Sequence, residues 1–278
     1  MTRIITILLF VNSLALYPQG AWTQAKNTSY IQLSFYSISG YEELFANPDR
    51  DTEREISDNT LQLYGEYGLT DATTLIVNVP FKFLRSGRLN LQEFRMPFSE
   101  EGSRTALGNI GLGVKHRLLN DKWVLSAQLN VETNTSTFFE EEALRSGYDT
   151  WTIAPRLNVG RSFDRMFVQA YTGVDTRFNG YSSNFRLGAD FGILPLDRLW
   201  VIAFMDSSVS FQNGDIVLPP GNLLNGLYVN DQEFLAVGLK GIFEITDALG
   251  LMAGFTGAAS GNNVPKRGVL GFGVFGKF

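Results

Sequence analysis

The sequence predicts an all-β protein: a transmembrane, antiparallel, up-and-down β-barrel of about twelve strands. Three observations lead to this prediction. The chain begins with a segment typical of a secretory signal, continues with apolar residues at every second position, and ends in an aromatic residue. Segments of about ten residues with this alternation, separated by turns, are typical of strands that cross an outer membrane.

The N-terminal segment predicts export. Arg3 supplies a positive charge, and residues 4–16 are apolar except for one threonine, one asparagine and one serine. This run is shorter than the ~20 residues that a membrane-spanning helix needs, so we expect a cleaved signal peptide rather than an anchor. Small residues follow and favour cleavage after Ala25. The predicted organisation is a signal peptide over 1–25 and a barrel of the bacterial outer membrane over 26–278.

The composition fits an exported barrel. After residue 25 no stretch approaches ~18 uninterrupted apolar residues, which argues against helical spans. With no cysteine in the sequence, neither a disulfide nor a lipoprotein anchor can form, and a barrel is stabilised instead by backbone hydrogen bonds that close around a ring. The signal holds one of the 23 basic residues and none of the 28 acidic ones, which leaves a mature net charge of −6 and argues against a nucleic-acid partner.

The first six predicted strands place apolar residues on a lipid-facing side and polar or small residues on the other. They lie at residues 29–38, 59–69, 73–84, 110–117, 123–132 and 151–159. Their predicted lipid-facing residues include Ile31, Leu33, Phe35, Leu61, Leu63, Leu75, Val77, Phe81, Leu112, Val114, Leu125, Leu129, Ile153 and Leu157.

The last six predicted strands continue the pattern, with one exception. They lie at residues 168–175, 184–193, 199–209, 235–245, 249–259 and 269–278, with Val168, Phe185, Leu187, Phe191, Val237, Leu239 and Phe243 among the lipid-facing residues. The segment 199–209 is apolar on both faces, so alternation does not assign its lipid-facing side.

Connections between the predicted strands alternate between short and long. Short turns fall at residues 70–72, 120–122, 163–165, 196–198 and 246–248. Longer loops are expected at 39–58, which is strongly acidic, and at 85–106, 134–149, 179–180, 210–231 and 260–266. An even strand count with short turns at the periplasm and long loops outside fits bacterial barrels. Trp123, Trp151 and Trp200 follow connections and are expected in the two aromatic girdles.

A soluble β-sandwich is the alternative fold. It would hide its apolar faces between two sheets and use strands of about 5–6 residues. Longer strands with one polar face favour the barrel.

The C-terminal strand resembles the C-terminal signal of outer-membrane proteins, which ends in an aromatic residue and is read by the barrel-assembly machinery. Leu270, Phe272, Val274 and Phe278 share the lipid-facing parity. The resemblance assigns Phe278 and Phe272 to this assembly signal and implies the assembly machinery as a partner during insertion. Outer-membrane lipids and lipopolysaccharide are the expected surroundings of the folded barrel.

Two internal segments resemble a broad family of outer-membrane transporters, the type named for the meta-pathway of phenol degradation. The segments are residues 67–81, YGLTDATTLIVNVPF, and residues 107–115, LGNIGLGVK. Asn109 stands where the family usually has Asp, and Glu132-Thr133-Asn134 stands where Pro-Thr-Gly often follows. The resemblance covers about a quarter of the chain. It implies a transporter and leaves the substrate open.

No residue pattern predicts an enzyme, a metal site or a cofactor. His116 is the single histidine. It has lipid-face parity near the turn at 120–122, and no nearby serine has the context of a nucleophile. The acidic run Glu140-Glu141-Glu142 is typical of a solvated loop rather than a calcium site.

The barrel lumen is the candidate site. Charged residues with inward parity are predicted to line it, because a Lys or Arg facing the bilayer midplane costs about 2–4 kcal/mol. The candidates are Glu66, Lys82, Lys115, Arg117, Glu132, Arg156, Arg186, Asp190, Lys240 and Glu244, together with Asp175 and Lys277.

Such a lumen could transport a solute or be closed, and the lining residues leave two classes of solute open. A cationic stripe would leave a path for small anionic solutes, and Tyr36, Tyr64 and Tyr171 with segment 199–209 would instead line a route for hydrophobic ones. We therefore expect an outer-membrane channel or transporter for an unknown small solute. If the charges pair across the lumen, the alternative is a closed structural or surface-interaction barrel without transport.

Overall fold

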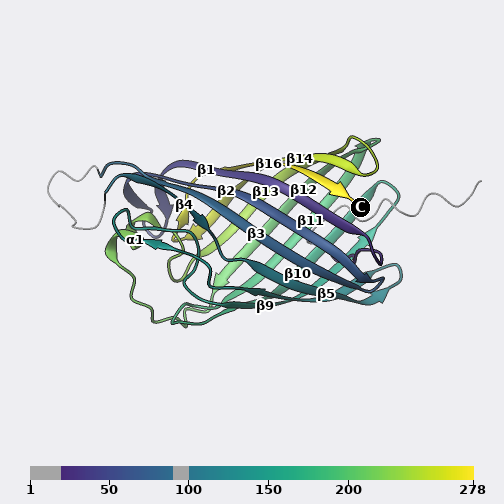
Figure 1. Cartoon of the computed structure of the whole chain (residues 1–278), viewed down its shortest axis with the longest axis horizontal. Helices are drawn as coiled ribbons and strands as arrows, with labels where there is room; N and C mark the ends of the chain where they lie inside the picture. The colour runs from purple at the N-terminus through teal and green to yellow at the C-terminus, as the bar shows by residue number, and fades with distance from the viewer. Residues whose placement is uncertain (1–19, 90–99) are drawn as a thin grey trace, which may run out of the picture.

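The computed structural model describes residues 20–89 and 100–278 and shows a closed antiparallel β-barrel of twelve strands (Figure 1). The predicted fold is confirmed. Most of the predicted signal peptide and the middle of the loop predicted at 85–106 lie outside the described residues. The barrel strands are β1 (Ser29–Phe45), β2 (Arg50–Thr70), β3 (Thr73–Ser86), β5 (Gly111–Asn120), β6 (Val124–Glu132), β9 (Thr152–Ser162), β10 (Met166–Arg177), β11 (Asn184–Leu196), β12 (Leu199–Ser210), β13 (Glu233–Glu244), β14 (Leu249–Asn262) and β16 (Val269–Lys277).

The first and last strands close the ring. β1 pairs with β16 from Tyr30 opposite Lys277 to Ser37 opposite Leu270, and on its other side β1 pairs with β2. Closure leaves neither terminal strand with an unpaired edge, so its backbone hydrogen bonds are satisfied even where the wall faces lipid. No helix among residues 20–89 and 100–278 is long and apolar enough to cross a membrane.

The two ends of the barrel differ in their connections. The five short turns predicted from the sequence all lie at one end, here called the turn end, where the C-terminus also lies (Figure 1). The long connections lie at the other end, here called the loop end. They contain the smaller elements β4 (Gly102–Leu107), β7 (Phe138–Phe139), β8 (Leu144–Arg145), α1 (Pro220–Asn225) and β15 (Val264–Pro265).

The outer surface of the strands is apolar, as the alternation predicted. Leu112, Leu157 and Phe272 are each more than half exposed, and so are many of their neighbours of the same parity. An apolar band of this kind around a closed barrel is the surface that lipid covers. The inward residues are mostly polar, glycine or aromatic, and the inward aliphatic residues Ile76, Ile202, Ile242 and Met252 lie together in one cluster.

The acidic segment predicted as a loop over 39–58 is mostly strand, so that prediction was wrong. β1 and β2 continue their pairing through Tyr41 opposite Ile56 and Leu44 opposite Arg50. Leu44 and Ile56 are completely buried under the loop-end connections. The charged residues between them hide this alternation, because above a membrane both faces of a hairpin can carry polar side chains.

Three other predicted loops also contain regular structure. The connection 85–106 includes β4, which pairs with β3 from Phe81 opposite Leu107 to Ser86 opposite Gly102. The connection 134–149 contains the β7–β8 hairpin, and 210–231 contains α1. These elements are short, and their stability depends on contacts with the barrel that the local sequence does not reveal.

The prediction that Trp200 belongs to an aromatic girdle was wrong. Trp123 and Trp151 are about half exposed on the outer surface, but Trp200 is buried inside the lumen. In β12 the inward residues Trp200, Ile202 and Phe204 are as apolar as the outward ones, which is why alternation could not assign the faces of this strand.

Candidate functional site

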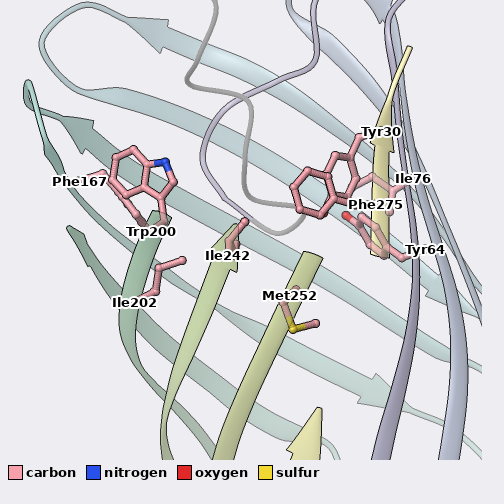
Figure 2. Packing of buried hydrophobic residues seen from close by; sticks show 9 residues of the cluster. All are labelled: Tyr30, Tyr64, Ile76, Phe167, Trp200, Ile202, Ile242, Met252 and Phe275. Atoms are coloured by element: carbon pink, nitrogen blue, oxygen red, sulfur yellow. The ribbon is translucent and has the colours of Figure 1, made fainter. Parts of the chain in front are cut away.

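An apolar cluster closes the lumen at the turn end. Its side chains project inward from strands on opposite sides of the barrel (Figure 2). The ring of Tyr30 stacks on Phe275 at 5.4 Å between centroids, and Phe167 meets Trp200 edge to face at 5.5 Å. The cluster contains Tyr30, Tyr64, Ile76, Phe167, Trp200, Ile202, Ile242, Met252 and Phe275. Together with residues 20–28 we call it the floor.

The segment before β1 lies inside the barrel and completes the floor. Ala21 is completely buried, and Trp22 packs edge-on against Phe167. Gln24 donates from its backbone N to Thr74 Oγ1 and from Nε2 to Glu66 Oε2 at 2.7 Å. The sequence predicts that residues 20–25 belong to the signal peptide, yet in the structure they pack inside the lumen and form hydrogen bonds there.

A polar network closes the lumen at the loop end. Buried Arg54 donates to Asn225 Oδ1 from Nε at 3.0 Å and from Nη2 at 2.9 Å, and also to the Glu142 carbonyl. Asn225 Nδ2 donates to the Ala143 carbonyl at 2.9 Å, which links α1 to the β7–β8 connection. Arg145 Nε donates to Asn222 Oδ1 at 2.7 Å. We call α1, residues 138–145 and this network the roof.

Beneath the roof lies a group of tyrosines. Tyr148 meets Tyr181 and Tyr228 edge to face at 5.3 and 5.4 Å. The Tyr148 hydroxyl donates to Gln232 Oε1 at 2.6 Å, and burial raises its pKa, so it stays a neutral donor at physiological pH. Arg177 lies over the Tyr148 ring, 4.2 Å from its centroid.

Between floor and roof the lumen holds two adjoining cavities. One has a volume of about 300 Å³ and reaches the floor at Ala21 and Met252. The other has a volume of about 240 Å³ and extends toward Asp175 and Glu132. Tyr64, Tyr171 and Asp206 line both. We call the two cavities together the chamber.

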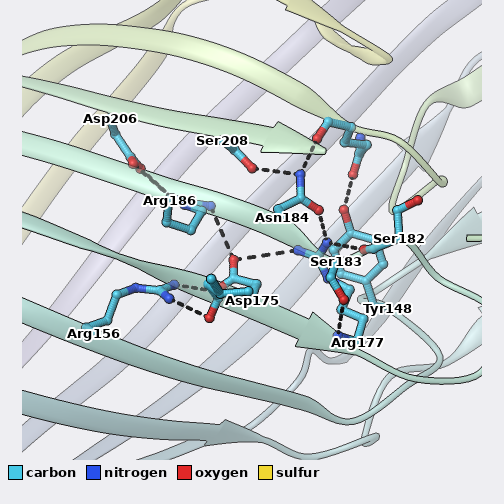
Figure 3. Close-up of polar contacts among 12 residues, drawn as sticks. Tyr148, Arg156, Asp175, Arg177, Ser182, Ser183, Asn184, Arg186, Asp206 and Ser208 are labelled. Atoms are coloured by element: carbon cyan, nitrogen blue, oxygen red, sulfur yellow. Dashed lines mark hydrogen bonds and ion pairs between the residues drawn. The ribbon is translucent and has the colours of Figure 1, made fainter. Parts of the chain in front are cut away.

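The charged side chains of the lumen pair with one another. In the cluster of Figure 3, Arg156 forms an ion pair with Asp175, Arg177 approaches Asp175 at 3.8 Å, and Arg186 pairs with Asp206 at 2.7 Å. Further inward pairs are Arg186–Asp175 at 3.7 Å, Lys82–Asp58 at 2.8 Å, Lys115–Glu66 at 3.2 Å, Lys240–Asp190 at 3.8 Å and Lys277–Glu244 at 2.7 Å.

The structure distributes the predicted lumen residues over three levels. Glu66 and Lys115 are buried at the floor, and Lys82 is buried toward the roof beside Tyr228. Glu132, Arg156, Arg186, Asp190 and Lys240 line the chamber. Glu244 and Lys277 pair near the turn end, and Arg117 lines neither cavity. That these residues line a solute path remains a prediction.

Sequence reasoning missed two carboxylates and the role of the inward glycines. Asp58 fell in a predicted loop and Asp206 in the strand without an assigned face, so their pairing with Lys82 and Arg186 was not foreseen. Inward parity identified the glycines only as small residues and predicted no role for them. The sequence does contain a signal for this role, because glycine inside a strand often marks a close approach by another group.

The single histidine lies on the outer surface. His116 Nδ1 shares a hydrogen bond of 2.9 Å with Thr73 Oγ1, next to the turn end. Neither residue lines the chamber. Among the described residues, no group of three His, Cys, Asp or Glu side chains could hold a metal ion.

No protein-family model matches the sequence, and no curated protein matches it. Solved structures do share its fold, a closed antiparallel β-barrel of the kind found in outer-membrane proteins. The COG4313 outer membrane channel from Pseudomonas putida F1 is 14% identical with a TM-score of 0.67, over 93% of this chain and 98% of that one. The KdgM porin is 7% identical with a TM-score of 0.53, over 90% of this chain and 99% of that one.

A third structure shows that the shared fold serves more than one function. The translocator domain of the autotransporter NalP from Neisseria meningitidis is 11% identical with a TM-score of 0.54, over 92% of this chain and 90% of that one. Channels, porins and a translocator domain thus share the architecture, and none of these is an enzyme. Function has to be argued from the lumen itself.

Proposed function

We propose that this protein is a bacterial outer-membrane channel for small solutes, held closed in the conformation described. The observation that carries the proposal is the chamber, whose cavities of about 300 and 240 Å³ lie between floor and roof. These volumes are at the small end of the range for ligand-binding pockets. A barrel with a purely structural role has no need to keep such a space between two closures.

The roof is the closure that we expect to move. Hydrogen bonds of a few side chains, chiefly Arg54, Asn222 and Asn225, join its short elements to one another and to β2, and a small apolar cluster that includes Leu144 and Leu227 packs with them. Water at the loop end can replace such bonds when the roof lifts. The apolar floor has no comparable substitute, because exposing its aromatic side chains to water costs free energy.

The finer assignment, to the transporter family named for the meta-pathway of phenol degradation, rests on the two resembling segments. In the second segment, residues 107–115, one side chain links neighbouring connections by hydrogen bonds. Asn109 lies between β4 and β5, and its Nδ2 donates to the carbonyls of Thr133 and Tyr148 at 2.8 and 2.9 Å. An Asp at this position, as the family usually has, could not donate these bonds, so the departure from the family pattern has a structural counterpart here.

Export and insertion complete the proposal. The N-terminal segment would direct the chain to the periplasm, and the terminal strand, with Phe272 and Phe278 exposed on its outer face, would be read by the barrel-assembly machinery. The loop end would then face outward among lipopolysaccharide, and the turn end the periplasm.

A closed structural barrel is the second candidate function. The specific observation in its favour is that the lumen is closed at both ends while most of its charges are paired. Single-channel recording of the refolded protein in a planar bilayer separates the two. We expect rare, discrete openings. A folded barrel that never conducts, with folding checked by its altered mobility on unheated gels, would contradict the channel and leave the structural role.

A further inference from the structure

Aromatic rings lie flat against the wall of the chamber because the neighbouring strand carries glycine beneath them. A Cβ at Gly271 would come within 2.9 Å of the Tyr36 ring, and the other two glycines leave even less space. Each ring therefore lies along the wall rather than filling the chamber. A cation lies over two of them, Arg156 at 5.9 Å from the Tyr171 centroid and Lys240 Nζ at 5.5 Å from the Phe204 centroid, whereas Tyr36 has no such neighbour among the described residues. The three pairs are Tyr36 over Gly271, Tyr171 over Gly188 and Phe204 over Gly238.

Side-chain amides line the rest of the chamber. Gln62 Nε2 donates to Asn78 Oδ1 at 2.6 Å, and Gln128 Nε2 donates to Asn130 Oδ1 at 3.0 Å. An amide has two donor hydrogens and an oxygen with two acceptor sites. Each of these pairs therefore retains hydrogen-bonding capacity that a solute in the chamber can use.

The charges of the chamber offer little to a charged solute. Three cationic side chains and four carboxylates line the two cavities, and Arg177 approaches one of these carboxylates at 3.8 Å. Positive and negative charges are thus balanced, and most are engaged in ion pairs. Glu132 has no ion pair among the described residues but lies in the field of Arg156, Arg177 and Arg186. An ion entering this space would therefore lose its hydration without gaining a counter-charge that is not already neutralised, which costs free energy.

We propose that the chamber selects an uncharged, ring-shaped solute with several hydroxyl groups, about the size of a monosaccharide. This inference rests on the proposed channel function. The apolar face of such a ring stacks on Tyr36, and its hydroxyls bond to the amides of both cavities. An aromatic solute with a single hydroxyl would stack equally well but would leave most of these amides unused.

The test is osmotic swelling of liposomes that contain the full mature protein. D-glucose, D-glucuronate and D-glucosamine share a ring of similar size and differ in charge. We expect glucose to enter at least about tenfold faster than either charged sugar, because each of these must be desolvated without a free counter-charge.

A pair of variants on one strand links this selectivity to the chamber wall. Gly238→Ala should push the Phe204 ring into the chamber and slow glucose entry several-fold. Its Cβ would also lie 2.6 Å from the Phe255 carbonyl oxygen, so entry is compared only in protein whose folding is confirmed by its altered mobility on unheated gels. Gly241→Ala is the matched control on β13, since its Cβ would meet only the Trp200 carbonyl oxygen, at 3.9 Å, and should leave entry unchanged.

The outcomes distinguish failure of the proposed substrate class from failure of the proposed channel function. If glucuronate or glucosamine enters as fast as glucose, the substrate class is overturned while the channel stands. If Gly238→Ala and Gly241→Ala behave alike, the wall does not select the solute, which also overturns the class. If no solute enters liposomes containing folded protein, the channel fails and the class with it.

Discussion

Floor and roof close the same lumen by different means. The floor is built from side chains of the barrel strands and one inserted segment, and its contacts are apolar or fully buried ion pairs. The roof is built from connections. Polar side chains join these connections to one another, and a smaller apolar cluster that includes Leu44, Leu144 and Leu227 packs them against the strands. A closure made from the wall itself can open only if the barrel is disturbed, whereas one made from loops can lift alone. The difference indicates which end acts as the gate.

The largest effect is expected from breaking the buried ion pair of the floor. Lys115 is completely inaccessible and Glu66 almost so. Lys115→Met leaves the Glu66 carboxylate buried without its counter-charge and should reduce the free energy of unfolding by about 3–5 kcal/mol. Urea unfolding in lipid vesicles measures this. The control Lys266→Met breaks exposed ion pairs with Asp49 and Glu43 and should leave the free energy of unfolding nearly unchanged. Equal losses would mean that the floor is no more rigid than the surface.

The next effect tests whether the inserted segment belongs to the mature floor. Gln24 donates a hydrogen bond to the buried Glu66 carboxylate. Gln24→Ala should therefore destabilise the protein by about 1.5–3 kcal/mol. Cleavage after Ala25, as the sequence predicts, would remove this residue, and the substitution would then leave the stability of the mature barrel unchanged. We expect retention, and the intact mass of protein extracted from the outer membrane checks it independently.

A smaller effect on stability, with a larger one on opening, is expected at the roof. Asn225→Ala removes the acceptor of two hydrogen bonds from the buried Arg54 guanidinium. We expect a loss of about 1–2 kcal/mol, because water can enter the space that the amide leaves. The open probability in single-channel recordings should rise several-fold. Leu223→Ala, at an exposed position on the same helix, is the control and should change neither quantity. A roof variant that loses stability without opening more often would contradict the gate.

The smallest effect is expected at the exposed tip of the β1–β2 hairpin. Hydrogen bonds from Lys266 Nζ and from the Ala46 backbone lower the pKa of Asp49 below its ordinary value of 3.8. The stabilisation that this depressed pKa provides is present above pH 3.8 and is lost as the pH falls through the lower pKa of the folded state. A carbon-13 carboxyl titration should show a midpoint below 3.8 that Lys266→Met raises. An unchanged midpoint would show that the contact does not persist in solution.

The sequence predicted the barrel well because lipid and lumen impose opposite chemistry on alternate residues. Where that contrast is present, as in β6, the alternation directly predicts which residues face lipid and where the turns lie. The contrast disappears in β12, where Trp200 and Ile202 pack into the floor and Phe204 lines the chamber, so that the inward face is as apolar as the outward one. It also disappears above the membrane, where the β1–β2 hairpin no longer needs an apolar outer face.

The chamber was less predictable than the wall. Inward parity identified Arg156, Arg186 and Lys240, but a parity pattern does not contain the distance to a partner across the barrel. The pairing of Arg186 with Asp206, and the flat rings over glycine, depend on register between strands that are distant in sequence. The occupation of the floor by residues 20–25 likewise depends on contacts with β2, β3, β5 and β10 that no local pattern reports.

The central claim, a chamber that opens through the roof, is tested most directly by labelling a single cysteine inside it. The chain has no cysteine, so Asn130→Cys places one thiol in the chamber without background. Intact cells are treated from outside with a small uncharged maleimide, with and without Asn225→Ala in the roof. The account predicts slow labelling with the wild-type roof and labelling several-fold faster with the variant. A thiol that stays unlabelled in both would contradict it and leave a barrel closed for structural reasons.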